Sequence, residues 1–160
     1  MKVKKWIISI ILILIITAAG ISIKVYLTAM EPVKAAESKA VSIAKKEIDL
    51  RKVHNFSIYN GLEQINVIEG ENKQGEQIVV WIPEKSKKVF FEKANNGLSK
   101  EQAIQKLNDE INPKEIISVR LGMEKNTPLW EIYYRSNNNL INYYYIHFTT
   151  GEWLKKIENL

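Results

Sequence analysis

Residues 129–148 read LWEIYYRSNNNLINYYYIHF and decide the fold of the C-terminal half of the chain. Two runs rich in aromatic and β-branched residues, Leu129 to Arg135 and Leu140 to Phe148, flank the polar segment Ser136 to Asn139. Such runs separated by a short polar connection are typical of paired antiparallel strands. The sequence therefore predicts a hairpin at the centre of a β-sheet.

Alternation of side chains between the two faces of a strand divides this hairpin into a buried and an open face. We expect Trp130, Ile132, Ile146 and Phe148 to lie in the core. The opposite face holds the candidate partner-binding residues, which are Tyr133, Arg135, Tyr143, Tyr145 and His147, with Trp81 of an earlier strand at the position that matches His147. Rigid aromatic side chains and Arg are common in interface hot spots. Two other interpretations are a half-exposed sheet stabilised by tyrosine pairs, and a face that packs the two halves of the protein together.

The surrounding sequence completes one helix and four strands in this half. Ser99, followed three residues later by Gln102, predicts a capping box that opens a helix to about Glu110, and Pro113 ends it. Strands are predicted at 116–121 and 153–157 on either side of the hairpin.

The first half follows the same plan. An Ala-rich amphipathic pattern predicts a helix from Pro32 to Leu50, with the apolar run of the N-terminus joining it almost without a linker. Three or four strands follow, marked by alternation around residues 56–58, 65–67, 78–82 and 89–91. Residues 80–82 align with 146–148, which indicates a weak internal duplication. One unit of this size buries little surface, so we expect the two halves to pack together.

The N-terminus contains a candidate membrane anchor. Trp6 to Ile23 carries no charge and is close to the length that crosses a bilayer as a helix. Three lysines precede this run and only Lys24 follows it closely, which places the N-terminus in the cytoplasm. We therefore expect a cytoplasmic tail at 1–5, an uncleaved transmembrane signal anchor at 6–27 and an extracytoplasmic remainder. A cleaved signal peptide is the alternative, because small residues at 17–20 and 27–29 offer cleavage sites.

Composition excludes several classes of function. The chain has 23 basic and 18 acidic residues and a net charge of +5, but residues 1–30 hold four Lys and no acid, so the remainder is close to neutral at +1. A nucleic-acid-binding domain would carry a basic face, so no nucleic acid is expected. The absence of Cys excludes disulfides, thiolate zinc sites, cysteine nucleophiles and lipid attachment to Cys.

Motifs for catalysis are also missing. His54 and His147 lack the spacing of a helical metal pair, and no GxSxG serine motif occurs. Glu131 beside Trp130 suits a glycan groove, but a glycosidase needs a second carboxylate at a defined distance, and the sequence identifies none. We therefore expect no enzyme, no cofactor, no metal and no small-molecule substrate.

Several segments resemble one known family. They are the Lys-flanked anchor, the helix KAAESKAVSIAKKEIDL, the strand IVVWIPEKSKKV, the helix start GLSKEQAI, the strand LWEIYY and the closing YYYIHFTTGEW. Together they resemble the TseB-like cell wall elongation regulators of Gram-positive bacteria. The resemblance implies an α+β chain in which a transmembrane helix precedes two tandem PepSY-like (cystatin-like) domains, at 31–96 and 97–160, each a helix on an antiparallel sheet.

The family also implies a function. It implies a non-enzymatic protein at the cell membrane that regulates peptidoglycan elongation and cell shape by contact with a penicillin-binding transpeptidase. PepSY modules also accompany secreted proteases, so an inhibitor of an extracytoplasmic protease is the alternative. A small lytic or glycan-binding protein is a third hypothesis.

Overall fold

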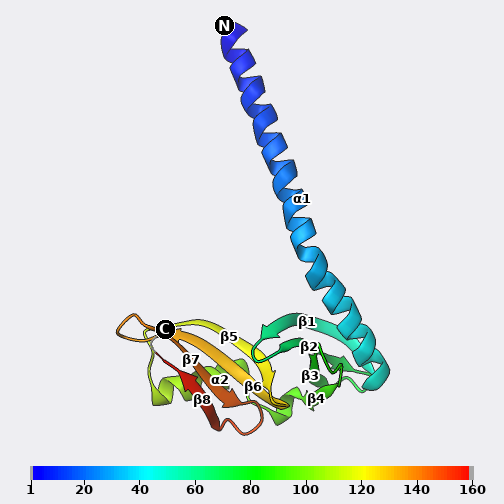
Figure 1. Ribbon diagram of the computed structural model, residues 1–160, viewed down its shortest axis with the longest axis vertical. Helices are drawn as coiled ribbons and strands as arrows, with labels where there is room; N and C mark the ends of the chain where they lie inside the picture. The colour runs from blue at the N-terminus through cyan, green and yellow to red at the C-terminus, as the bar shows by residue number, and fades with distance from the viewer. Residues whose placement is uncertain (1, 159–160) are drawn as a thin grey trace. The chain divides into compact units, whose positions relative to one another are not determined.

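A computed structural model describes residues 2–158 and has an α+β fold (Figure 1). A long apolar helix, α1 (Lys2–Glu47), precedes two four-stranded antiparallel sheets, and this confirms the predicted fold class. The chain divides into two compact units, one ending at Ala36 and one beginning at Glu37.

The first unit is the apolar part of α1. An 18-residue window has a mean hydropathy of 2.4 and is 0% buried, so the helix is long and apolar enough to cross a membrane. The hydroxyls of Thr17 and Ser22 donate to the carbonyls of Ile13 and Ala18, at 2.8 and 2.9 Å, so their polar groups are satisfied within the helix. These properties are compatible with a single-pass anchor or with a signal sequence.

The predicted helix start at Pro32 is wrong, because α1 runs through Pro32 without interruption. A proline inside a helix removes one backbone hydrogen bond, but the surrounding Ala, Lys and Glu residues are good helix formers. The helix ends at Glu47, before the predicted Leu50, and Asp49 with a φ of 54° directs the chain into the first strand.

The first sheet is a meander of β1 (Leu50–Asn60), β2 (Gln64–Asn72), β3 (Gln77–Pro83) and β4 (Phe90–Lys93), in that order. One face of this sheet packs against the last turns of α1. The buried residues of this contact are Ala40, Ala44, Leu50, Ile68, Ile78, Val80 and Ile82. Small Ala side chains let the helix approach the sheet closely, so helix and sheet form one module.

A short 3-10 turn, η1 (Ala94–Asn96), leads to α2 (Lys100–Glu110), which begins with the predicted capping box. The Gln102 N–H donates to Ser99 Oγ at 3.2 Å, and the Ser99 N–H donates to Gln102 Oε1 at 2.8 Å. Each contact satisfies a backbone N–H group that has no carbonyl partner within the helix.

The second sheet is again a meander, of β5 (Glu115–Glu124), β6 (Thr127–Arg135), β7 (Ile141–His147) and β8 (Trp153–Ile157). The predicted bounds of β8 are confirmed. β5 continues beyond the predicted end at Leu121, because it pairs with β6 as far as the turn at Lys125 and Asn126. The side chains predicted for the core are buried, namely Trp130, Ile132, Ile146 and Phe148.

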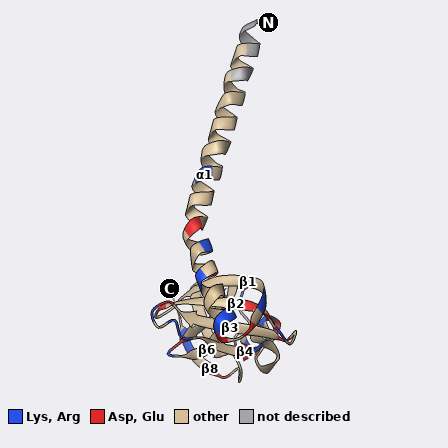
Figure 2. Ribbon diagram, turned by 90° about the vertical axis from the view of Figure 1, so that its right-hand side faces the viewer, with Lys and Arg blue, Asp and Glu red and all other residues tan. Residues whose placement is uncertain are grey.

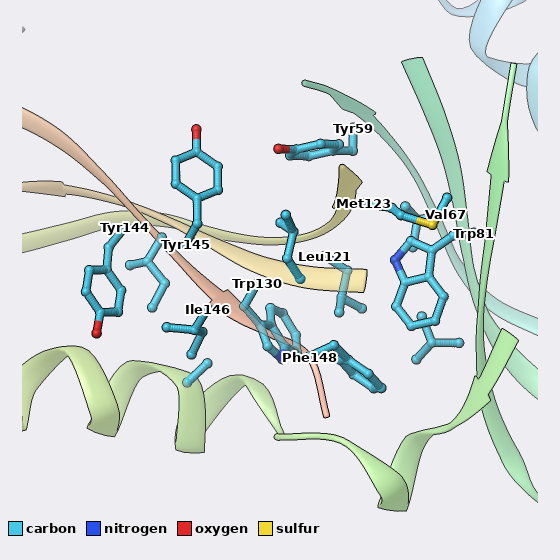
Figure 3. Close-up of a cluster of buried hydrophobic side chains, with 14 of the residues drawn as sticks. Tyr59, Val67, Trp81, Leu121, Met123, Trp130, Tyr144, Tyr145, Ile146 and Phe148 are labelled. Atoms are coloured by element: carbon cyan, nitrogen blue, oxygen red, sulfur yellow. The ribbon is translucent and has the colours of Figure 1, made fainter. Parts of the chain in front are cut away.

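A shared hydrophobic core joins the two modules, as predicted (Figure 3). The face of the first sheet that points away from α1 contributes Tyr59, Val67 and Trp81 to this core. The second module contributes Trp130 and Phe148. The rings of Trp81 and Phe148 meet edge to face, with centroids 5.1 Å apart, a favourable geometry for aromatic pairs.

Polar contacts at Glu84 tie α1 to the first sheet. The carboxylate lies 2.5 Å from the Lys87 ammonium and 3.2 Å from the Lys39 ammonium, and it accepts a hydrogen bond of 3.1 Å from the buried Asn66 amide. Hydrogen bonds from Lys87 first, and then from Lys39, lower the pKa of Glu84 from 4.5 to about 2.

A pH titration tests this carboxylate. Because its pKa is depressed in the folded state, Glu84 stabilises the fold above pH 4.5, and this contribution is lost as the pH falls toward about 2. We expect the Glu84→Gln variant to lose less thermal stability than the wild type when the pH is lowered from 4.5 to about 2. Near-UV circular dichroism of the full chain in detergent measures the unfolding midpoint. Glu47→Gln, which removes an exposed carboxyl of the same helix, is the control and should keep the pH dependence of the wild type. An equal loss of stability with falling pH in all three proteins would contradict the assignment.

Close packing of Tyr59 on Gly122 gives a second test. A Cβ at residue 122 would lie 2.6 Å from Cε2 of Tyr59, so Gly122→Ala should lower the free energy of unfolding by about 1 to 3 kcal/mol. Chemical denaturation measures this loss. In a Tyr59→Ala background the ring is absent, and the same substitution should cost far less. An equal loss of unfolding free energy in both backgrounds would mean that contact with the Tyr59 ring is not its cause.

Candidate partner-binding face of the second sheet

The face of the second sheet that points away from α2, here called the open face, gathers the predicted tyrosines. The register of β6 and β7 sets Tyr133 opposite Tyr143 and places Tyr145 two residues further along the same face. The rings of Tyr133 and Tyr143 stack with centroids 4.8 Å apart, and those of Tyr143 and Tyr145 lie 6.3 Å apart. The first two tyrosines are half-buried, and Tyr145 is buried. The prediction that strand pairing brings these rings together is confirmed.

Arg135 and His147 lie at opposite ends of the open face. Arg135 pairs with Glu115, with Nε 3.2 Å from the carboxylate. His147 lies opposite Leu129 in the register, and its Nδ1 accepts hydrogen bonds from the backbone N–H groups of Thr149 and Thr150, at 3.1 and 3.2 Å. One ring nitrogen of His147 is thus occupied in holding the turn before β8.

Trp81 lies in the shared core, and its predicted exposure alongside the tyrosines is wrong. It occupies the corresponding strand and face of the first sheet, but the second module covers that face, and the side chain is 0% exposed. The structure supports the other interpretation for Trp81, namely that its face of the sheet packs the two halves of the protein together. Its indole N–H is buried without an acceptor in the described part of the chain.

Charged residues lie among the tyrosines, and of these the sequence analysis considered only Glu131. Glu131 is opposite Tyr145, is only 4% exposed, and accepts a hydrogen bond of 3.0 Å from Arg120 Nε. The Lys155 ammonium lies 4.2 Å from the centroid of the Tyr145 ring and 2.6 Å from a carboxylate oxygen of Glu124. One row therefore crosses the four strands of the sheet. It consists of Arg120, Glu131, Tyr145 and Lys155.

This row reaches the first module through one hydrogen bond. The Tyr59 hydroxyl, from β1, donates to Glu124 Oε1 at 3.1 Å. Arg120, Gly122 and Glu124 alternate along β5, so strand periodicity could have placed them on one face. The predicted strand ended at Leu121, however, and the pairing register of β5 with β6 cannot be read from the sequence.

Burial gives the tyrosine hydroxyls a fixed protonation state. Desolvation, followed by the negative charge of Glu131, raises the pKa of Tyr145 well above its ordinary value. Desolvation also raises the pKa of Tyr59, with the charges of Glu131 and Glu124 adding to the effect. Both hydroxyls therefore remain protonated donors at neutral pH.

The chemistry of the open face suits binding of a polar partner. A hollow of about 190 Å³ beside Tyr145 is lined by both apolar and charged residues, including Leu129, Leu154 and Lys155. Among residues 2–158, no group of three or more His, Asp or Glu side chains is placed to hold a metal ion. Glu131, the carboxylate considered for glycan cleavage, is engaged by Arg120. Aromatic rings with hydrogen-bonding groups at their edges are what protein interfaces use.

Replacing Arg120 tests the buried carboxylate. Arg120→Gln leaves Glu131 without its cation, and because the Arg side chain is 48% exposed, the expected loss of unfolding free energy is about 1 to 2 kcal/mol, below that of a fully buried pair. Arg135→Gln breaks a more exposed pair of the same sheet and should change stability by less than about 0.5 kcal/mol. Urea denaturation of both variants provides the comparison. Equal losses would mean that Glu131 does not depend on Arg120.

Comparisons with known proteins agree with this architecture. Residues 39–83 match the cell wall elongation regulator TseB-like domain, and residues 97–157 match the peptidase propeptide and YPEB domain, PepSY. The probable cell wall elongation regulator TseB of Bacillus subtilis (strain 168) is 33% identical over 138 residues, which cover 86% of each chain. The solved structure of the YpmB protein from Bacillus subtilis superposes with a TM-score of 0.73 at 34% identity, covering 76% of this chain and 95% of that one. The chain therefore belongs to the TseB-like family of cell wall elongation regulators.

Proposed function

We propose that this protein is a membrane-anchored regulator of peptidoglycan elongation that acts by contact with a penicillin-binding transpeptidase and catalyses no reaction itself. The observation that carries this proposal is the 33% identity, over 86% of both chains, to a probable cell wall elongation regulator. The open face supports the contact mechanism, because it presents stacked tyrosines and ion-paired residues, side chains that serve recognition.

Charge asymmetry supports an uncleaved anchor. Residues 6–27 would cross the membrane, with the Lys-rich residues 1–5 in the cytoplasm and the domains at 31–96 and 97–160 outside. Anchoring confines the protein to the surface where wall synthesis occurs and raises its effective concentration for other membrane proteins. A weak contact through the open face would then suffice for regulation.

The binding surface that we propose consists of Tyr133, Arg135, Tyr143, Tyr145 and His147. Tyr143 is its central residue, since its ring lies between those of Tyr133 and Tyr145. The half-buried rings of Tyr133 and Tyr143 can lose their remaining exposure to a partner with little loss of side-chain freedom. Trp81 is not part of this surface because the second module covers it, whereas Tyr145, although buried, lines the hollow of the open face.

Site-specific photocrosslinking in living cells tests the proposal. A photoreactive phenylalanine replaces Tyr143 in the full-length protein, and a matched control replaces Gln105, which is exposed on α2. We expect a penicillin-binding transpeptidase to crosslink to the Tyr143 probe and not to the Gln105 probe. Mass spectrometry of the purified adduct identifies the partner, and crosslinking to an extracytoplasmic region also establishes the orientation of the anchor.

The PepSY match gives one competing function. Because that family description refers to peptidase propeptides, inhibition of an extracytoplasmic protease is the second candidate. Recovery of a protease at Tyr143 would favour it. Equal crosslinking of the transpeptidase at both positions would refute the open face as the contact, and recovery of glycan alone would indicate wall binding.

A further inference from the structure

A second surface, on the first module, combines basic and apolar side chains. It joins the last turn of α1 to the connection between β3 and β4, and Figure 2 shows basic residues at this end of the helix. We call it the basic patch. Ile48, Lys88, Val89 and Phe91 line one hollow together with Glu47, and the exposed Lys45, Lys46 and Lys85 are their neighbours in the sequence. None of these residues belongs to the open face.

A shallow hollow joins the two segments of the basic patch. It has a volume of about 430 Å³ and is lined by the apolar Ile48, Val89 and Phe91 and by polar residues that include Glu47, Lys87 and Lys88. Ile48 and Val89 are partly buried against the core of the first module. Phe91 is 51% exposed, although it pairs with Val80 on the helix-facing side of the sheet. A large aromatic ring is therefore left in solvent at the edge of an apolar floor.

The basic patch has an excess of positive charge, because its four lysines outnumber Glu47, the carboxylate that lines the same hollow. Glu84, the nearest carboxylate of the connection, is already paired with Lys87 and Lys39. Within residues 2–158, none of the four patch lysines forms a side-chain ion pair, and the Lys88 ammonium lies 4.7 Å from the centroid of the Phe90 ring. The chain beyond residue 30 has a net charge of only +1, so the basic patch concentrates positive charge.

We infer that the basic patch docks on the anionic phospholipid surface of the membrane that holds the anchor. Lysines attract anionic headgroups, and an exposed Phe beside aliphatic residues inserts at the boundary between headgroups and acyl chains. A hydrophilic polyanion of the cell wall would use the lysines but would gain nothing from Phe91. The apolar component therefore favours lipid.

The anchor keeps the basic patch within reach of the bilayer. Lys45 follows residue 27 by 18 positions, which correspond to about 27 Å of straight helix. This short connection confines the basic patch to the neighbourhood of the anchored end and raises its effective concentration for lipid. The inference rests on the proposed anchoring but not on the identity of the protein partner.

Because the chain contains no Cys, a single introduced cysteine can report on lipid contact. Ser86→Cys in the full-length protein carries a fluorophore sensitive to polarity, and the protein is reconstituted into vesicles that contain lipids with a quencher near the headgroup. We expect quenching at least about twofold stronger with phosphatidylglycerol than with phosphatidylcholine alone, and weaker at high salt. Asn137→Cys, in the loop between β6 and β7, is the matched control and should be quenched equally in both lipids.

Two variants separate the basic and apolar contributions. Lys85→Gln combined with Lys88→Gln should abolish the difference between the two lipids, and Phe91→Ser should shift the fluorophore emission toward that of a solvent-exposed label. Near-UV circular dichroism verifies that both variants are folded. Since the assay contains no transpeptidase, its result does not depend on the proposed partner.

Three outcomes would overturn the inference. They are equal quenching in both lipids, quenching that persists after loss of both lysines, and quenching that is equally strong at Asn137. Protection of the Ser86 label by soluble poly(glycerol phosphate), without quenching by phosphatidylglycerol, would assign the basic patch to a wall polymer and would likewise refute lipid docking.

Discussion

Burial of one face of the first sheet against the second module is the constraint on which the rest of the structure depends. A helix on four strands is too small to bury a sufficient core alone, and the two modules solve this by sharing one. Trp81 and Val67 of the first sheet are inaccessible for that reason. The first module covers the equivalent face of the second sheet only at one end, where Tyr59 packs on Gly122, and further along that face Tyr133 and Tyr143 stay half-buried.

The shared core also determines the shape of the open face. Gly122 leaves room for the Tyr59 ring, whose hydroxyl reaches Glu124, and Glu124 in turn holds Lys155 over Tyr145. A residue of the first module is therefore hydrogen-bonded into the charged row of the second. Any change in packing between the modules would move the cation beside the central tyrosines. With the proposed function of the open face, stability and recognition would be coupled through this one contact.

Strand periodicity was sufficient to predict the fold and to place the tyrosines on one face, because alternation is a local property of the chain. It failed for Trp81, since the same alternation cannot tell whether solvent or another module covers a face. It also missed Arg120 and Glu124, whose position depends on the pairing register of β5 and on the turn that ends it. The partner of Glu131 is set by contacts between neighbouring strands, and the spacing of residues along the sequence does not determine these contacts.

Two weak contacts on one anchored protein restrict orientation more than either does alone. In the proposed arrangement, an uncleaved anchor would tether the protein to the bilayer but leave its rotation free, while docking of the basic patch would fix which side of the first module faces lipid. The shared core holds both sheets in one unit, so that orientation passes to the open face. The tyrosines would then meet a membrane-bound partner with less orientational entropy to lose, and this raises the effective concentration of the correct encounter.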